Sequence, residues 1–172
     1  MQTLFLIVVG LLILLAITDL IVGVSNDAVN FLVSAIGSNA APFRIIMIIA
    51  SLGVLFGATF SSGMMEIARK GIFHPELFSF GDIMIIFLAV MLTDVILLDV
   101  FNSLGLPTST TVSIVFELLG SAVAIALMLV IKNNQGYGEV SEYINTAKAL
   151  EIIGGILLSV VVAFTIGAIV QY

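Results

Sequence analysis

Two short polar clusters interrupt an otherwise apolar chain, and both consist of residue types that bind ions. The first is SNDAVNFLVSAIGS (25–38) and the second is PTSTT (107–111). Carboxylate, amide and hydroxyl oxygens are the ligands of hard cations such as sodium. Hydroxyl groups and free backbone N–H groups at a helix N-terminus bind oxyanions. The two clusters together therefore indicate a protein that binds a cation and an anion.

The first cluster predicts a cation site on one face of a helix. In a helix that begins near Asn26, residues spaced three, four and seven apart share a face. That face carries Asp27, Asn30, Ser34 and Ser38. Helix capping by Asn26 or Asp27 is the alternative interpretation, but it explains one polar residue and not three more on the same face. We expect a cation, first of all sodium, to bind at Asn26, Asp27, Asn30 and Ser34.

The second cluster predicts an anion site at the start of a helix. Pro107 suits a first helical turn because it has no N–H to leave unpaired. The four hydroxyl residues that follow, Thr108, Ser109, Thr110 and Thr111, lie beside the first free backbone N–H groups. A helix N-terminus has a partial positive charge, so it attracts anions without an arginine. The alternatives are simple capping and hydrogen bonding between packed helices.

Four further acidic residues lie inside apolar segments, where a carboxylate is costly and indicates a functional site. They are Asp19, Asp94, Asp99 and Glu117. Glu117 shares a helix face with Thr110, Ser113 and Ser121, and it could bind a cation or a proton. Asp94 and Asp99 point about 140° apart on a helix and cannot share a ligand directly, whereas Asp99 and Asn102 can. Each acid could instead pair with a polar group on a neighbouring helix.

The composition shows which elements must position these residues. Of the 172 residues, 61% are hydrophobic and 9% are charged, against about 25% charged in a globular domain. Five apolar segments are long enough to cross a membrane, namely 4–24, 45–65, 83–101, 111–131 and 149–170. The piece 25–38 would reach only about 21 Å as a helix, so we expect a re-entrant or broken half-helix there. The predicted fold is an all-α polytopic integral membrane protein.

Two polar linkers, 66–82 and 132–148, separate these segments within one transmembrane domain, 1–172. If both segments between them cross the membrane, the linkers lie on the same side. The second linker, 132–148, has no apolar periodicity and is expected to be a flexible loop. The stretches 16–30 and 97–111 repeat one design, in which an apolar helix with an aspartate runs through glycine into a polar cluster. Such repeated helix breaks are typical of transporter binding sites.

Several other classes of protein are not supported. There is no cysteine, and a net charge of −6 with five scattered Lys and Arg gives no basic patch for nucleic acid. We find no nucleophile–base pair, phosphate-binding glycine loop or His/Glu metal motif, so we do not expect an enzyme. The lone His74 has no partner at ligand spacing and is expected to be solvated. No cofactor is expected apart from a coupling ion.

The two clusters resemble a known family. SNDAVNFLVSAIGS resembles the Gly-x-Asn-Asp-x-x-Asn signature of the inorganic phosphate transporter (PiT) family, and GLPTSTTVSIVFELLG resembles its Pro-x-Ser-Thr-Thr motif with the following glycine, Gly120. RKGIF (69–73) also fits. The chain departs from the family pattern at Val24, Phe31 and Val112, and at Gly53 where some members have glutamate.

The resemblance implies transport of inorganic phosphate together with sodium or protons. It implies that Asn26, Asp27 and Asn30 serve the cation and that Ser109, Thr110 and Thr111 bind phosphate. Members contain two inverted repeats, each with one copy of the motifs, so the chain corresponds to one half. We expect either a fragment or a half-size protein that pairs with a second half or a second copy, in the bacterial inner (plasma) membrane. A passive anion channel and a non-transporting half subunit are the alternatives.

Overall fold

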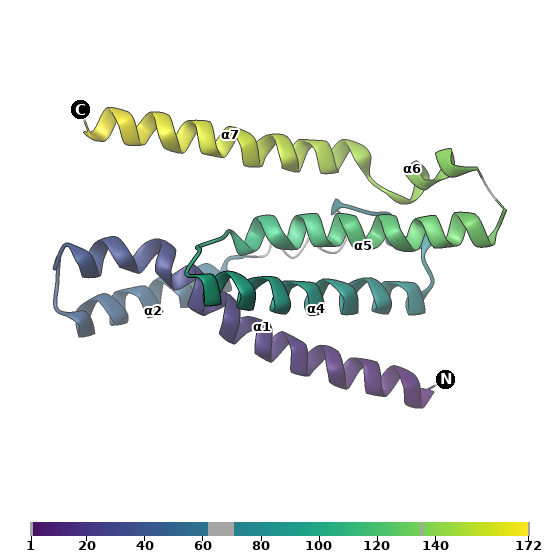
Figure 1. Ribbon diagram of the computed structural model, residues 1–172, viewed down its shortest axis with the longest axis horizontal. Helices are drawn as coiled ribbons and strands as arrows, with labels where there is room; N and C mark the ends of the chain where they lie inside the picture. Colours follow the sequence, from purple (N-terminus) through teal and green to yellow (C-terminus); the bar gives the residue numbers. More distant parts are fainter. Residues whose placement is uncertain (1, 62–70, 135, 172) are drawn as a thin grey trace.

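The computed structural model describes residues 2–61, 71–134 and 136–171, and within them the chain is almost entirely helical. Five main helices follow in order (Figure 1): α1 (Gln2–Gly37), α2 (Phe43–Thr59), α4 (Phe80–Leu104), α5 (Thr110–Lys132) and α7 (Thr146–Gln171). Three short helical turns lie in the linkers: η2 (Pro75–Leu77), η3 (Tyr137–Glu139) and α6 (Val140–Tyr143). The predicted all-α class is confirmed.

Helices α1, α4 and α5 form the bundle that positions the polar clusters. Figure 1 shows α1 and α4 running in the same direction, with α5 returning beside α4. Helix α4 begins with a capping box between Ser79 and Asp82. It ends with Gly105 as its C-cap, whose φ of 68° suits glycine. The tight turn after Gly105 brings the PTSTT cluster back over the end of α4. Buried apolar residues on facing turns fill the space between α4 and α5, including Ile86, Val90, Val115, Leu118, Ala122 and Ala126.

Helix α1 is continuous, so the break predicted near Val24 and the separate half-helix at 25–38 are wrong. Two features are consistent with the continuity. Gly23 faces α4, where a Cβ would be in ordinary contact with Leu98 Cδ1 at 3.6 Å. The Ser25 hydroxyl donates to the Ile21 carbonyl at 2.8 Å, within the helix. Such a bond often bends a helix without ending it, and Figure 1 shows α1 changing direction where it passes the end of α4.

The end of α1 and helix α2 form a hairpin that projects past the turn between α4 and α5 (Figure 1). The chain turns at Asn39, which has φ 51°, and α2 then runs back for 17 residues. The predicted spanning segment 45–65 is therefore shorter as a helix than expected, although its last residues, 62–65, lie outside the described residues. Most large apolar side chains of α2 are exposed, so this hairpin has little contact with the bundle.

The described parts of the two polar linkers meet at the opposite end of the bundle, in keeping with the expectation that the linkers lie on the same side. Phe73 and Ile144 form an antiparallel bridge, and the His74 N–H donates to the Tyr143 carbonyl at 2.9 Å. Phe73 is 1% exposed and its ring packs edge-on against Phe78. The described part of the linker 132–148 is therefore packed and partly helical, contrary to the prediction of a flexible loop. Residues 66–70 of the first linker, which include most of RKGIF, lie outside the described residues.

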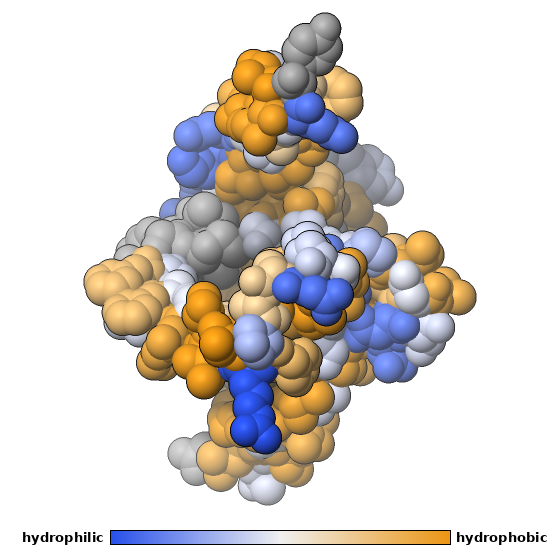
Figure 2. Space-filling model, turned by 90° about the vertical axis from the view of Figure 1, so that its left-hand side faces the viewer, coloured by the Kyte–Doolittle hydropathy of each residue, from blue (hydrophilic) through white to orange (hydrophobic). Residues whose placement is uncertain are grey.

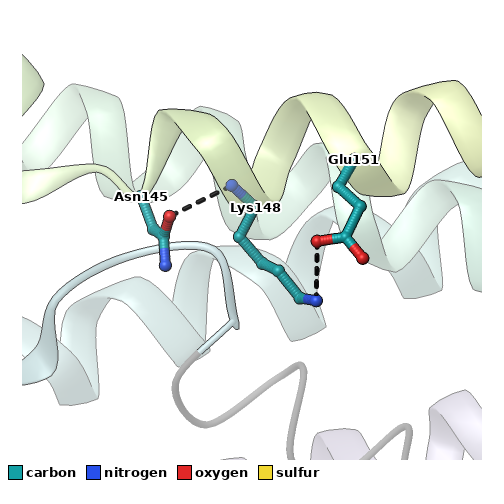
Figure 3. A network of polar contacts seen from close by, with 3 residues as sticks. All are labelled: Asn145, Lys148 and Glu151. Carbon is teal, nitrogen blue, oxygen red and sulfur yellow. Dashed lines mark hydrogen bonds and ion pairs between the residues drawn. The ribbon is translucent and has the colours of Figure 1, made fainter.

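Asn145 joins the paired linkers to helix α7. Its side chain accepts a hydrogen bond from the Lys148 N–H at 3.0 Å, and Lys148 Nζ lies 2.8 Å from Glu151 Oε2 (Figure 3). An asparagine three residues before the N–H that it accepts from is a helix cap. The cap fixes the start of α7 beside the linkers, and most of the remaining α7 surface is apolar and exposed.

The surface is that of a membrane protein. Four helices of the described residues, α1, α4, α5 and α7, are long and apolar enough to cross a membrane. Figure 2 shows the end of the molecule that carries the hairpin, where apolar surface dominates and hydrophilic groups gather in small patches. Soluble monomers rarely expose large apolar surfaces, so these helices are integral to a membrane.

Candidate functional site

The two polar clusters, far apart in sequence, meet where α1 passes the turn between α4 and α5. Asn26, Asp27 and Asn30 project from α1, and Thr108 and Thr110 come from the start of α5. The sequence predicted a cation site and an anion site without placing them relative to each other. The structure places residues of the two clusters in direct contact.

Asn26 clamps the second cluster onto α1. It is 1% exposed, and its Nδ2 donates to Asn102 Oδ1 at 2.8 Å. Its Oδ1 accepts from the Thr108 N–H at 3.0 Å. Asn102 in turn donates to the Val22 carbonyl at 3.1 Å. Because both ends of the Asn26 amide already have protein partners, its clearest role in the structure is to join three segments.

Asp27 and Thr110 form the direct link between the two predicted sites. The Thr110 hydroxyl donates to the Asp27 carboxylate, with Oγ1 3.0 Å from Oδ2 and 3.3 Å from Oδ1. Thr110 is the first residue of α5, so the Asp27 carboxylate lies next to the positive end of that helix. The arrangement leaves the other carboxylate lone pairs available to a cation.

Asn30 and Ser34 are the next two residues of the predicted cation face, and only Asn30 contacts the second cluster. Asn30 Nδ2 donates to the Thr108 carbonyl at 3.1 Å, so its side chain also holds the linker. Ser34 is exposed and lies a further turn along α1, within the projecting hairpin. The structure thus brings Asn26, Asp27 and Asn30 together and does not bring Ser34 to them.

The start of α5 differs from the prediction in one respect. Pro107 precedes the helix and is not its first residue, because Ser109 is the N-cap and accepts from the Val112 N–H at 3.4 Å. The cap therefore uses one of the four hydroxyl residues, and Thr110 contacts Asp27. Thr111 is exposed at the first turn. The Thr110 and Thr111 N–H groups have no backbone partner in the described helix, as expected at an N-terminus.

A cavity of about 190 Å³ extends from Asp27 and Thr110 into the bundle. Two of the predicted acidic residues, Asp19 and Asp94, line the same cavity, and Gly23 lies between Asp19 and Asp27 along α1. Asp94 is 1% exposed, and one carboxylate oxygen of each of these two acids is buried without a hydrogen-bond partner. The cavity therefore joins residues from three helices.

Glu117 lies on a second, larger cavity between α4 and α5, of about 580 Å³. Ser113 and Ser121 line it as well, as the shared helix face predicted. Both Glu117 carboxylate oxygens are buried without a hydrogen-bond partner, while the Ser121 hydroxyl donates to the Glu117 carbonyl at 2.8 Å. Thr110, which the same stripe included, faces the smaller cavity instead.

Asp99 and Asn102 do not share a site. Asp99 is exposed on α4 and lines neither of these two cavities, whereas Asn102 turns toward α1 and bonds to Asn26. Sequence reasoning paired Asn102 with the wrong partner because spacing along one helix says nothing about the helix packed against it. The signal that could have found it is an asparagine in an apolar segment, which needs a polar partner.

The electrostatics of the smaller cavity are negative. The basic side chains among the described residues are Arg44, His74, Lys132 and Lys148, which lie at helix ends and in the linkers. Within those described residues, no three His, Cys, Asp or Glu side chains are placed to hold a metal ion together. A cation here would have to combine carboxylate oxygens with hydroxyl, carbonyl or water oxygens.

A family model and several known proteins are similar to this chain. Residues 23–172 match the model of the phosphate transporter family. A predicted phosphate permease of Thermococcus kodakarensis is 28% identical over 135 residues, which cover 77% of this chain and 32% of that protein. Another, of Pyrococcus abyssi, is 34% identical over 104 residues, covering 59% of this chain and 26% of that protein.

A third relative, a predicted phosphate permease of Pyrococcus furiosus, is 31% identical over 109 residues, covering 62% of this chain and 26% of that protein. The chain thus matches about a third or less of the length of each of these relatives. No solved structure matches the chain. The matched region contains both polar clusters, together with the end of α1 and the whole of α4 and α5, and the chain belongs to the phosphate transporter family.

Proposed function

We propose that this chain forms part of a secondary transporter that moves inorganic phosphate across a membrane together with a cation, sodium or a proton. The observation that carries the proposal is the hydrogen bond between Thr110 and Asp27. It joins the anion-binding end of a helix to a carboxylate suited to a cation. Family membership supports phosphate as the substrate.

Phosphate would bind at the N-terminus of α5. The free N–H groups of Thr110 and Thr111 and the hydroxyls of Ser109, Thr110 and Thr111 are the donors. Thr108 contributes less, because its backbone is held by Asn26 and Asn30. Charge-assisted hydrogen bonds of this kind recognise an oxyanion by shape and charge.

The cation would bind at Asp27, with Asn30 beside it and Asn26 holding the geometry. Asp27 supplies the negative charge, and the carbonyl oxygen of the Asn30 side chain faces no protein donor among the described residues. This assigns Asn26 chiefly a positioning role, which narrows the ligand set expected from the sequence. Sodium is the first candidate because the available oxygens are hard ligands without a group of three acids.

Coupling between the two ions follows from their separation. A phosphate at the start of α5 would lie within about 5 Å of the Asp27 carboxylate, where two like unit charges repel by about 3 kcal/mol at an effective dielectric constant of about 20. A cation on Asp27 removes that repulsion and replaces it with attraction. Phosphate and the cation would then bind more tightly together than separately, which is the thermodynamic requirement for cotransport.

The functional unit would contain more than this chain. The chain matches about a third or less of the relatives, which favours a second half or a second copy that completes the transport path. A half that cannot transport alone is therefore the second candidate. We place the protein in the plasma membrane of a prokaryote. The three relatives are archaeal, so they give no support to the bacterial membrane expected from the sequence.

The test is phosphate uptake into liposomes that contain the full-length protein. An inward sodium gradient should accelerate uptake, and Asp27→Asn should abolish that acceleration while the protein stays folded in the membrane. Glu142→Gln, which removes an exposed carboxylate in the linker, is the matched control. Sodium activation that is equal in Asp27→Asn and in the parent would contradict the cation assignment. Phosphate uptake that is not accompanied by uptake of sodium or protons would favour a passive channel.

A further inference from the structure

The Asp19 and Asp94 carboxyl groups are unexplained by the site described so far. They come from α1 and α4, line the cavity that begins at Asp27, and lie close enough to interact directly. Asp94 is 1% exposed, and Oδ1 of each residue is buried with no hydrogen-bond donor. A buried carboxylate without a partner is strongly unfavourable, so these two acids must either share a proton or bind a cation in this cavity.

No basic side chain of the described residues lines this cavity. The basic side chains of the described residues lie at helix ends and in linkers, and the charges that act on Asp94 are those of Glu117, Asp19 and Asp27, all negative. Two acids that face each other in a membrane bundle usually mark an ion pathway. The cavity, about 190 Å³, has room for a cation with water, since one water occupies about 30 Å³.

We propose that Asp19 and Asp94 bind a second monovalent cation, deeper in the bundle than the cation at Asp27. The two positions are distinct, because Asp19 and Asp27 are eight residues apart on α1, or about 12 Å along the helix axis. Both line one continuous cavity, and Gly23 between them leaves the passage open. Two carboxylates from different helices, with water, supply the oxygen ligands that a sodium ion prefers.

The inference rests on the proposed cation coupling but is tested separately, by sodium binding in the absence of phosphate. The purified full-length protein in lipid nanodiscs is titrated with radioactive sodium. The parent should bind more sodium per chain than Asp94→Asn or Asp19→Asn, and each variant should retain the position at Asp27. Asp99→Asn, on the exposed face of α4, should bind sodium as the parent does. Equal binding by the parent and both cavity variants would overturn the inference.

A measurement on the parent protein covers the case in which the variants fail to fold. A hydrophobic carbodiimide modifies buried carboxyl groups, and mass spectrometry locates the modified residue. Sodium should slow modification of Asp94 by about tenfold or more, because the bound ion contacts the carboxylate directly, and potassium should protect less.

If the two acids share a proton instead, raising the pH will protect Asp94 and sodium will not, which would also overturn the inference. The proposed function fails in a different way. It fails if sodium does not drive phosphate uptake, or if Asp27→Asn leaves sodium activation unchanged. Protection of Asp94 by sodium in a protein that does not transport phosphate would thus leave the deeper cation site standing alone.

Discussion

Replacing Asn26 with leucine tests whether this residue is a clamp or a cation ligand. Leucine has similar volume, but it removes the bond to Asn102 at 2.8 Å and the bond from the Thr108 N–H at 3.0 Å. Hydrogen bonds between helices in a membrane contribute about 0.6 kcal/mol on average and about 1.7 kcal/mol at most. Two of them give about 1–3 kcal/mol. The third contact, to the Leu106 carbonyl at 3.5 Å, is too long to add much.

The assay must suit a chain without cysteine or tryptophan, so thermal unfolding is followed by circular dichroism of the helices in nanodiscs. Asn26→Leu should unfold at a lower temperature than the parent. Ser25→Ala is the matched control, because Ser25 lies next to Asn26, is exposed, and bonds only within α1. The clamp is refuted if Asn26→Leu unfolds with the parent and changes only the sodium concentration needed for uptake. That result would show that Asn26 acts as a cation ligand, as expected from the sequence.

Two further predictions concern the start of α5 and the opposite end of the bundle. Thr110→Val should weaken phosphate binding by roughly tenfold to a hundredfold, since a hydrogen bond to a charged group contributes about 1.5–3 kcal/mol. Because Thr110 bonds to Asp27, the same substitution should also change how phosphate binding depends on sodium. Thr111→Val should weaken phosphate binding alone, and equilibrium binding at several sodium concentrations separates the two. Phe73→Ala should cost about 3–5 kcal/mol of stability in the same unfolding assay, whereas Leu77→Ala, at 48% exposed, should cost little.

The sequence predicted the elements well because long apolar segments leave few choices. A backbone inside a membrane must satisfy its own hydrogen bonds, so an apolar run of about 20 residues is a helix. The spans around 83–101, 111–131 and 149–170 accordingly match α4, α5 and α7 to within three residues at each end. The continuity of α1 was missed because glycine and serine permit a break without requiring one.

The sequence predicted which residues belong to the candidate site, but it did not predict which of them contact each other. Periodicity along one helix grouped Asp27 with Ser34, and the structure instead pairs Asp27 with Thr110, 83 residues away. Long-range pairs of this kind depend on how two helices cross, which a single sequence does not encode locally. The same limit explains Asn102, which was paired with Asp99 on its own helix and in fact bonds to Asn26.

Gly23 has one meaning in the sequence and another in the structure. In the sequence it marked a helix break, and in the structure it lies four residues from both Asp19 and Asp27, on the wall of their shared cavity. A Cβ there would be in ordinary contact with Leu98 Cδ1 at 3.6 Å and Thr110 Cγ2 at 3.8 Å. A longer side chain would occupy the space between the two acids. The absence of a longer side chain at Gly23 thus leaves the cavity open between Asp27 and the deeper pair.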